Sequence, residues 1–197
     1  LRAEAAKSNY DLFIFANYGA YTSTILYDAG ERDVINIPVF SEFDGVITLP
    51  DTFDIGGMET LLINKIKTSS DCPIVAVRNG SNECYRVLFN DYETTYNQTK
   101  HFIEEHHLTK ICYMSGPLSA DDAVIRLNGF KSAMIDSGLD PSNVVFEGDF
   151  WNFLSVPATD FFLNCYDGAP EAIIFANDHM ALGVCEELRK RGLKVPE

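Results

Sequence analysis

The chain is short of positive charge. Its 197 residues contain 15 lysines and arginines against 29 aspartates and glutamates, a formal net charge of −14. No basic patch or stripe interrupts this balance, and a surface of this sign repels phosphate backbones and anionic membranes. The composition therefore predicts a poor nucleic-acid binder with no membrane association of its own.

Long apolar runs and cysteine motifs are also missing. No run approaches the roughly 20 apolar residues that a membrane-spanning helix needs. The five cysteines form no C-x-x-C pair, and Cys72, Cys112 and Cys185 lie within or beside apolar segments. The first residues lack the charged-then-apolar layout of a secretion signal. These features predict reduced cysteines in a cytoplasmic protein.

Catalytic and metal-binding motifs are absent as well. The sequence has no G-x-S-x-G elbow, no P-loop and no H-E-x-x-H motif. His106 and His107 are adjacent, so on a helix they point about 100° apart. No cysteine or carboxylate pattern joins them or His101 to complete a metal site. We therefore expect no enzyme activity, no metal and no cofactor.

What is present is a regular alternation of apolar strands and helices. The hydrophobic fraction of 46% is enough for a sizeable core. Continuous apolar strands between helices are typical of α/β folds, in which doubly wound parallel sheets carry helices on both faces. The segment 34–40 is read as a possible edge strand that tolerates its proline. Strands are predicted at 11–16, 43–50, 72–79, 86–91, 110–116, 143–150 and 171–178, and helices at 56–68, 93–107, 121–137, 155–166 and 178–191.

Arg126 is the first candidate ligand residue. It lies near the start of the 121–137 helix, beside a core stripe at helical spacing formed by Ala123, Leu127, Phe130 and Met134. A cation gains nothing from the helix dipole at this end. Its five-donor fork suits a polyol or a carboxylate ligand. The alternative is an ion pair with Asp121, Asp122 or another carboxylate.

Further candidates follow the ends of strands, where ligands of parallel sheets collect. The Asn177 amide suits a ligand hydroxyl, or bonds its own backbone in a turn, and Asp178 is expected to be the N-cap of the next helix. Phe150, followed by Trp151, offers a flat face for a sugar ring, although aromatic residues are usually core. Arg78 ends an apolar strand and reaches either a cleft or solvent.

Several segments together resemble the sensor domain of the lactose repressor (LacI/GalR) family. "GPLSADDAVIRLNGF" (116–130) is similar to its G-P-x-x-x…R-x-x-G-F pattern, and "FANDHMALG" (175–183) to its A-N-D-x-M-A-x-G helix. "FDGVITLP" (43–50) resembles a family strand, and 87–116 resembles the hinge, helix and strand before the Gly-Pro turn. The order and spacing of these segments are more specific than any one of them.

The resemblance implies a two-lobed, periplasmic-binding-protein-like (type I) fold. The N-terminal lobe is expected at 1–89 and the C-terminal lobe at 90–197, with Asn90 at the hinge. Arg126, Asn177 and Phe150 match ligand-binding positions, and Arg78 stands at a less diagnostic one. The implied ligand is a small effector, a sugar or a nucleoside, that signals by lobe closure.

The resemblance is incomplete. The family's first strand, its last strands and its helix-turn-helix have no counterpart, so we expect a piece of a longer regulator. Such a regulator would be a homodimer that contacts DNA only through a domain absent from this chain. Two alternatives stay open: the sensor of a signalling enzyme such as a diguanylate cyclase, towards which 29–41 points, and an exported solute-binding protein of a transporter.

Overall fold

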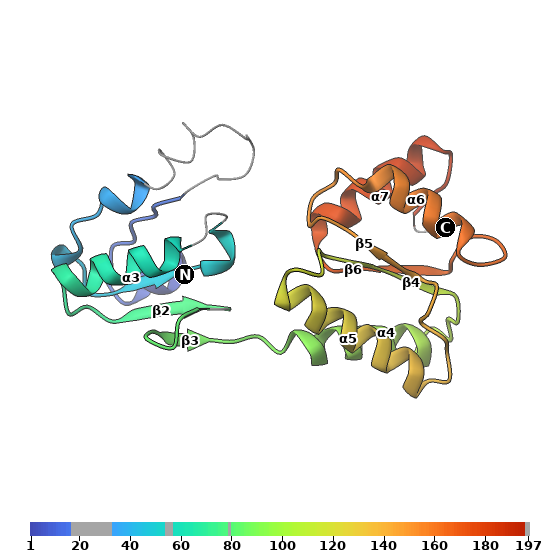
Figure 1. Ribbon diagram of the computed structural model, residues 1–197, viewed down its shortest axis with the longest axis horizontal. Coiled ribbons are helices and arrows are strands. Elements are labelled where there is room, and N and C mark those ends of the chain that lie inside the picture. The colour runs from blue at the N-terminus through green and yellow to red at the C-terminus, as the bar shows by residue number, and fades with distance from the viewer. Residues whose placement is uncertain (17–32, 54–56, 79, 196–197) are drawn as a thin grey trace. The chain divides into compact units, whose positions relative to one another are not determined.

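The computed structural model describes residues 1–16, 33–53, 57–78 and 80–195. By their internal contacts they fall into two compact units, Leu1–Phe89 and Asn90–Glu197. Each unit has its own three-stranded sheet (Figure 1). Each also has its own cluster of buried apolar residues. The expected start of a helix at Gly56 and the end of a strand at Asn79 lie outside the described residues.

The first unit is built on a parallel sheet in the order β1-β2-β3. Its strands are β1 (Val46–Thr48), β2 (Ile74–Val77) and β3 (Tyr85–Val87), and its longest helix is α3 (Met58–Ser69). Its remaining described elements are α1 (Arg2–Lys7) and the 3-10 turns η1 (Val34–Asn36), η2 (Phe40–Glu42) and η3 (Pro50–Thr52). The core consists of Phe40, Leu62, Ile63, Ile66 and Ile74.

Two strands predicted in this unit are wrong. Asp11–Ala16 forms no strand, and its apolar side chains are open to solvent, with Ile14 77% exposed. Val34–Phe40, the possible edge strand, is replaced by η1 and the start of η2. Apolar content alone does not make a strand, since the backbone also needs a neighbouring strand to hydrogen-bond. Within the described residues neither segment has such a neighbour.

The second unit is built on a parallel sheet in the order β5-β4-β6. The strands are β4 (Ile111–Ser115), β5 (Val145–Glu147) and β6 (Ala172–Phe175). Helices α4 (Asp91–Glu104) and α5 (Asp121–Asp136) cover one face, and α6 (Ser155–Asn164) and α7 (Asp178–Lys190) cover the other (Figure 1). The predicted α/β class with parallel sheets is therefore confirmed.

The core of this unit follows the predicted periodicity. Every residue of β4 is buried, and the Tyr113 ring stacks on Phe130 of α5 with 4.9 Å between ring centroids. The predicted stripe of Ala123, Leu127, Phe130 and Met134 is buried as a whole. Gly129 lets α4 approach closely, because an added Cβ would lie 2.4 Å from the Tyr92 carbonyl oxygen.

Candidate functional site

The candidate site lies in the second unit, at the edge where its three parallel strands end. Phe150 follows β5, Ser115 ends β4, and Ala176 and Asn177 follow β6. The Asn177 Nδ2 atom donates to the Phe150 carbonyl at 2.7 Å. The loops after β5 and β6 are thereby tied together, which brings two predicted ligand residues into contact.

Arg126 is bound to the same edge. Its Nη1 atom donates to the Ala176 carbonyl at 2.9 Å, one residue before Asn177. Its Nε atom donates to Asp91 Oδ1 at 3.0 Å, and its Nη2 atom lies 3.2 Å from Asp122 Oδ2. The structure therefore brings Arg126, Asn177 and Phe150 together. The ion pair that the sequence allowed as an alternative is also present, with Asp122.

The charges of this cluster do not balance. One guanidinium faces two carboxylates, so the three side chains sum to +1 − 2 = −1. The exposed fractions are only 12% for Arg126 and 20% for each aspartate, so solvent screens them less than it does surface charges. Arg126 contacts described residues with three of its five N–H groups, which leaves two for a ligand. The local field disfavours an anionic ligand.

Two buried hydroxyls of β4 lie behind this edge. Burial raises the pKa of Tyr113, while the nearby Arg126 guanidinium acts in the opposite direction, so the phenol stays protonated at neutral pH. Ser115 Oγ is fully buried and has no hydrogen-bond partner among the described residues. The Tyr113 hydroxyl was not singled out from the sequence, because a tyrosine in an apolar strand carries no separate signal.

Phe150 is held in an unusual backbone conformation. Its φ of 65° lies in the left-handed region, which costs a non-glycine residue about 1–2 kcal/mol. Its ring lies against Gly116, where an added Cβ would be 2.1 Å from Phe150 Cε1. The bond from Asn177 to its carbonyl holds the strained residue in place. Strain maintained in this way is typical of binding sites.

The predicted helix cap was placed one residue too late. Asn177, not Asp178, is the N-cap of α7, and its Oδ1 accepts from the Met180 amide at 3.0 Å. A cap residue needs an extended backbone, and Asn177 has it with φ −154° and ψ 171°. Asp178 is the exposed first residue of the helix. The cap prediction for Asp178 is therefore wrong, and the turn-asparagine alternative for Asn177 is present.

The remaining two predicted residues are Arg78 and Asn90. Arg78 belongs to the first unit, directly after β2, with φ 76° and its guanidinium 5.3 Å from the Phe89 ring centroid. Asn90 caps α4, where its side chain accepts from the Glu93 amide at 3.2 Å. The ligand role of Arg78 and the hinge role of Asn90 stay predictions.

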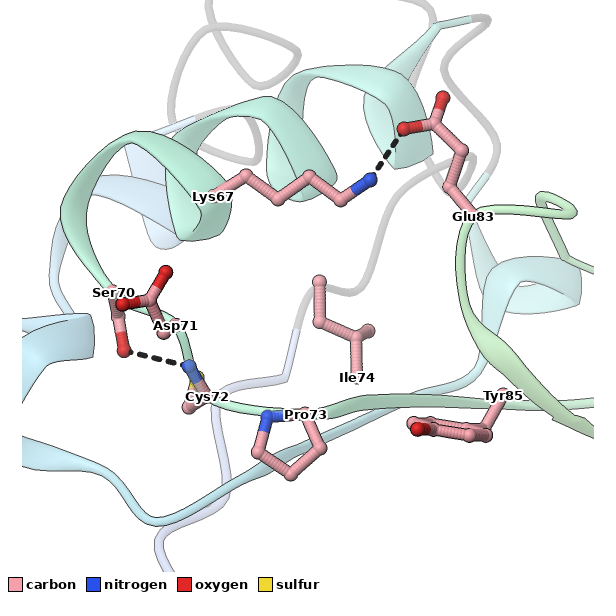
Figure 2. Close-up of a pocket in the computed structure, with 8 residues that line it drawn as sticks. All are labelled: Lys67, Ser70, Asp71, Cys72, Pro73, Ile74, Glu83 and Tyr85. Carbon is pink, nitrogen blue, oxygen red and sulfur yellow. Dashed lines mark hydrogen bonds and ion pairs between the residues drawn. The ribbon is translucent and has the colours of Figure 1, made fainter.

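A cavity of about 300 Å³ lies within the first unit (Figure 2). It is lined at the starts of two strands, by Ile74 of β2 and Tyr85 of β3, whereas ligands of such sheets collect at strand ends. An ion pair between Lys67 and Glu83 crosses it. None of the predicted ligand residues lines it, so we do not assign it to the effector.

The described part of the chain holds neither a cluster of metal ligands nor a helix suited to crossing a membrane. Within 1–16, 33–53, 57–78 and 80–195, no three histidine, cysteine or acidic side chains come together as metal ligands. His101 and His106 contact each other at 3.1 Å between Nε2 atoms without a third partner of that kind. No helix in these ranges has both the length and the apolar character that crossing a membrane requires.

The sequence is similar to a known domain family and to known repressors. Residues 99–197 match the family described as periplasmic binding protein-like domain. An HTH-type transcriptional repressor PurR of Vibrio atlanticus (strain LGP32) is 28% identical over 170 residues, 85% of this chain and 49% of the repressor. A PurR of Aliivibrio salmonicida (strain LFI1238) is 30% identical over 139 residues, 69% of this chain and 41% of the repressor.

Solved structures share the fold. The transcription regulator CcpA of Lactococcus lactis has a TM-score of 0.68 at 20% identity, over 99% of this chain and 67% of that protein. A sugar-binding transcriptional regulator of the LacI family from Escherichia coli, complexed with phosphate, has a TM-score of 0.61 at 21% identity, over 86% and 59%.

The chain therefore belongs to the periplasmic binding protein-like domain family. It spans about half the length of the curated relatives it matches. Those relatives are named HTH-type transcriptional repressors.

Proposed function

We propose that this chain is the effector-binding part of a cytoplasmic LacI-type transcription regulator. The observation that carries the proposal is the convergence of Arg126, Asn177 and Phe150 at one strand-end edge. A guanidinium with two N–H groups that no described residue accepts, an amide and a half-buried aromatic ring together suit a small ring that bears hydroxyls or ring nitrogens.

The proposed ligand is a neutral sugar, nucleoside or nucleobase. The net charge of −1 on Arg126, Asp91 and Asp122 supports a neutral ligand over a phosphate or a carboxylate. Asp91 and Asp122 also supply acceptors for ligand hydroxyls and N–H groups. The PurR repressors matched here make a purine-like ligand a natural first member of a test panel.

The proposed signal is lobe closure about Asn90 in a homodimer whose DNA-binding domain lies outside this chain. Effector binding shifts such an equilibrium only by the difference between its affinities for the two lobe arrangements. Full-length relatives that are named HTH-type repressors support this output over a signalling enzyme or a transporter.

Isothermal titration calorimetry of the chain tests the proposal, against ribose, glucose, galactose, adenosine, guanosine, hypoxanthine and guanine. The compound that binds is then titrated into Arg126→Lys and Arg126→Ala. Lysine keeps the charge but loses the planar fork, so we expect both variants to bind more weakly. Alanine is expected to lose about 2–5 kcal/mol of binding free energy. Unchanged affinity in a folded Arg126→Ala variant contradicts the assigned site.

A further inference from the structure

Two cysteines of the second unit lie in contact. Cys112 is the second residue of β4 and fully buried, and Cys165 follows the last residue of α6 and is half-buried. Their Sγ atoms are 2.8 Å apart, against about 2.05 Å in a disulfide bond. Both are free thiols in the structure. Residues 53 positions apart thus meet at nearly bonding distance.

Neighbouring bonds hold this arrangement in place. The Tyr166 hydroxyl donates to the Ile111 carbonyl at 3.1 Å, so the residues beside the two cysteines are already joined. The Cys165 thiol also donates to the Phe162 carbonyl at 3.2 Å, which fixes the sulfur against the end of α6. Closing the bond requires a small movement of side chains rather than a rearrangement of β4 and α6.

We propose that Cys112 and Cys165 are a reversible oxidation site, at which a low-molecular-weight disulfide such as oxidised glutathione converts the two thiols into one intramolecular disulfide. The inference stands on the geometry of this pair and is independent of the effector site. The remaining cysteines serve as internal references, because no described contact joins the sulfurs of Cys72, Cys84 or Cys185 to another sulfur.

The chemistry proceeds in two exchange steps. Cys165, the more exposed thiol, loses its proton to solvent, and its thiolate attacks one sulfur of glutathione disulfide. That S–S bond breaks, and one glutathione leaves as a thiolate with the bonding electron pair. Cys112 then loses its proton and attacks the Cys165 sulfur, which expels the second glutathione thiolate. Two protein thiols are oxidised, and one glutathione disulfide is reduced to two glutathione thiols.

The second step should limit the rate. Burial raises the pKa of Cys112, and the hydrogen bond between its thiol and the Cys165 sulfur acts in the same direction. The Cys112 thiolate is therefore scarce at neutral pH. As long as the pH stays below that pKa, the thiolate fraction rises about tenfold for each unit by which the pH is raised. We expect the rate of disulfide formation to increase steadily from pH 7 to pH 9, and a mixed disulfide on Cys165 to accumulate first.

Peptide mapping of the intact chain tests the proposal. The chain is incubated with oxidised glutathione, blocked with iodoacetamide and digested without reduction by trypsin and a glutamate-specific protease. Cleavage after Lys110 and Arg126 isolates Cys112, and cleavage after Glu171 separates Cys165 from Cys185. We expect one cross-linked pair containing Cys112 and Cys165, two hydrogens lighter than the separate peptides, and its loss on adding dithiothreitol.

Matched variants give the control. Cys165→Ser should abolish the cross-link, whereas Cys185→Ser, with its cysteine on α7, should leave it unchanged. The wild-type map decides the matter even if Cys165→Ser misfolds. A wild-type chain that carries only glutathione adducts, or disulfides through Cys72, Cys84 or Cys185, overturns the proposal.

Discussion

The Arg126 side chain and the Ala176 carbonyl are joined by a hydrogen bond of 2.9 Å between Nη1 and the oxygen. A residue of α5 is thereby fixed to the backbone position that precedes the Asn177 cap of α7. The bond explains why a cation lies near the start of α5, where the helix dipole opposes it. Backbone and carboxylate acceptors offset the unfavourable dipole, and they hold the guanidinium at the strand-end edge.

Removing that guanidinium should destabilise the second unit. Arg126→Met leaves Asp91 and Asp122 as two poorly exposed carboxylates without a countercharge. Breaking such a pair costs about 2–4 kcal/mol of unfolding free energy, which urea titration at pH 7 measures. The variant Arg126→Met with Asp91→Asn should recover part of the loss. Lys190→Met is the control, because Lys190 pairs with Glu186 but its side chain is 63% exposed. Its unfolding free energy should stay within about 0.5 kcal/mol of the wild-type value. Equal losses in the two methionine variants contradict this view.

The cap assignment can be tested with adjacent variants. Asn177→Ala removes the acceptor for the Met180 amide and the donor to the Phe150 carbonyl, for a loss of about 1–2 kcal/mol. Asp178→Ala removes only a favourable charge in the first turn, for about 0.5 kcal/mol or less. Thermal unfolding of both variants should show this order. A larger loss in Asp178→Ala would restore the cap role that the sequence first assigned to it.

Position 129 should not tolerate even the smallest side chain in place of glycine. Alanine is the better helix former by about 1 kcal/mol, but its Cβ would lie 2.4 Å from the Tyr92 carbonyl oxygen, a backbone atom that cannot rotate away. We expect Gly129→Ala to lose about 1–3 kcal/mol as α4 and α5 are forced apart. The neighbouring Asn128 is exposed on the same helix, so Asn128→Ala should be neutral or stabilising in urea titration. Neutral behaviour of Gly129→Ala would show that the two helices are less closely packed.

Glu171 makes the stability of the second unit depend on pH. Its carboxylate accepts from the Lys110 and Thr109 amides, and these bonds lower its pKa below the usual 4.5. A lowered folded-state pKa contributes stability above the unfolded-state pKa, and this stability is lost as pH falls through the folded-state value. The urea midpoint of the wild type should therefore exceed that of Glu171→Gln at pH 7, and the difference should shrink on acidification below pH 4.5. A difference that stays constant down to pH 3 would rule out these bonds.

The alternation of strands and helices was predictable where each strand has its partner. In the second unit, every predicted strand and helix is present, with ends shifted by a few residues. Asp11–Ala16 is as apolar as β6 yet forms no strand, because pairing is a property of the neighbouring backbone and not of the segment itself. Local composition does not record which segments have a partner.

The candidate site was predictable only in part, because several of its contacts join residues that are far apart in the sequence. Arg126 and Asn177 were predictable, because Arg126 lies in a recognisable motif and Asn177 directly follows a predicted strand. The contact between Arg126 and Asp91 spans 35 residues, and that between Cys112 and Cys165 spans 53. Such pairs form only when α4 packs on α5 and α6 packs beside the sheet. A local sequence pattern therefore does not predict them. The cap is Asn177 and not Asp178 because the backbone of Asn177 is extended, and the sequence does not record that conformation.

The central claim is that the effector binds at the carboxyl edge of β5-β4-β6. Amide chemical-shift mapping of the ¹⁵N-labelled chain, titrated with the compound that calorimetry identifies, tests it most directly. We predict the largest shifts at Gly116, Trp151 and Asn177. Shifts confined to the lining of the cavity in Figure 2, with those three amides unmoved, would contradict the account.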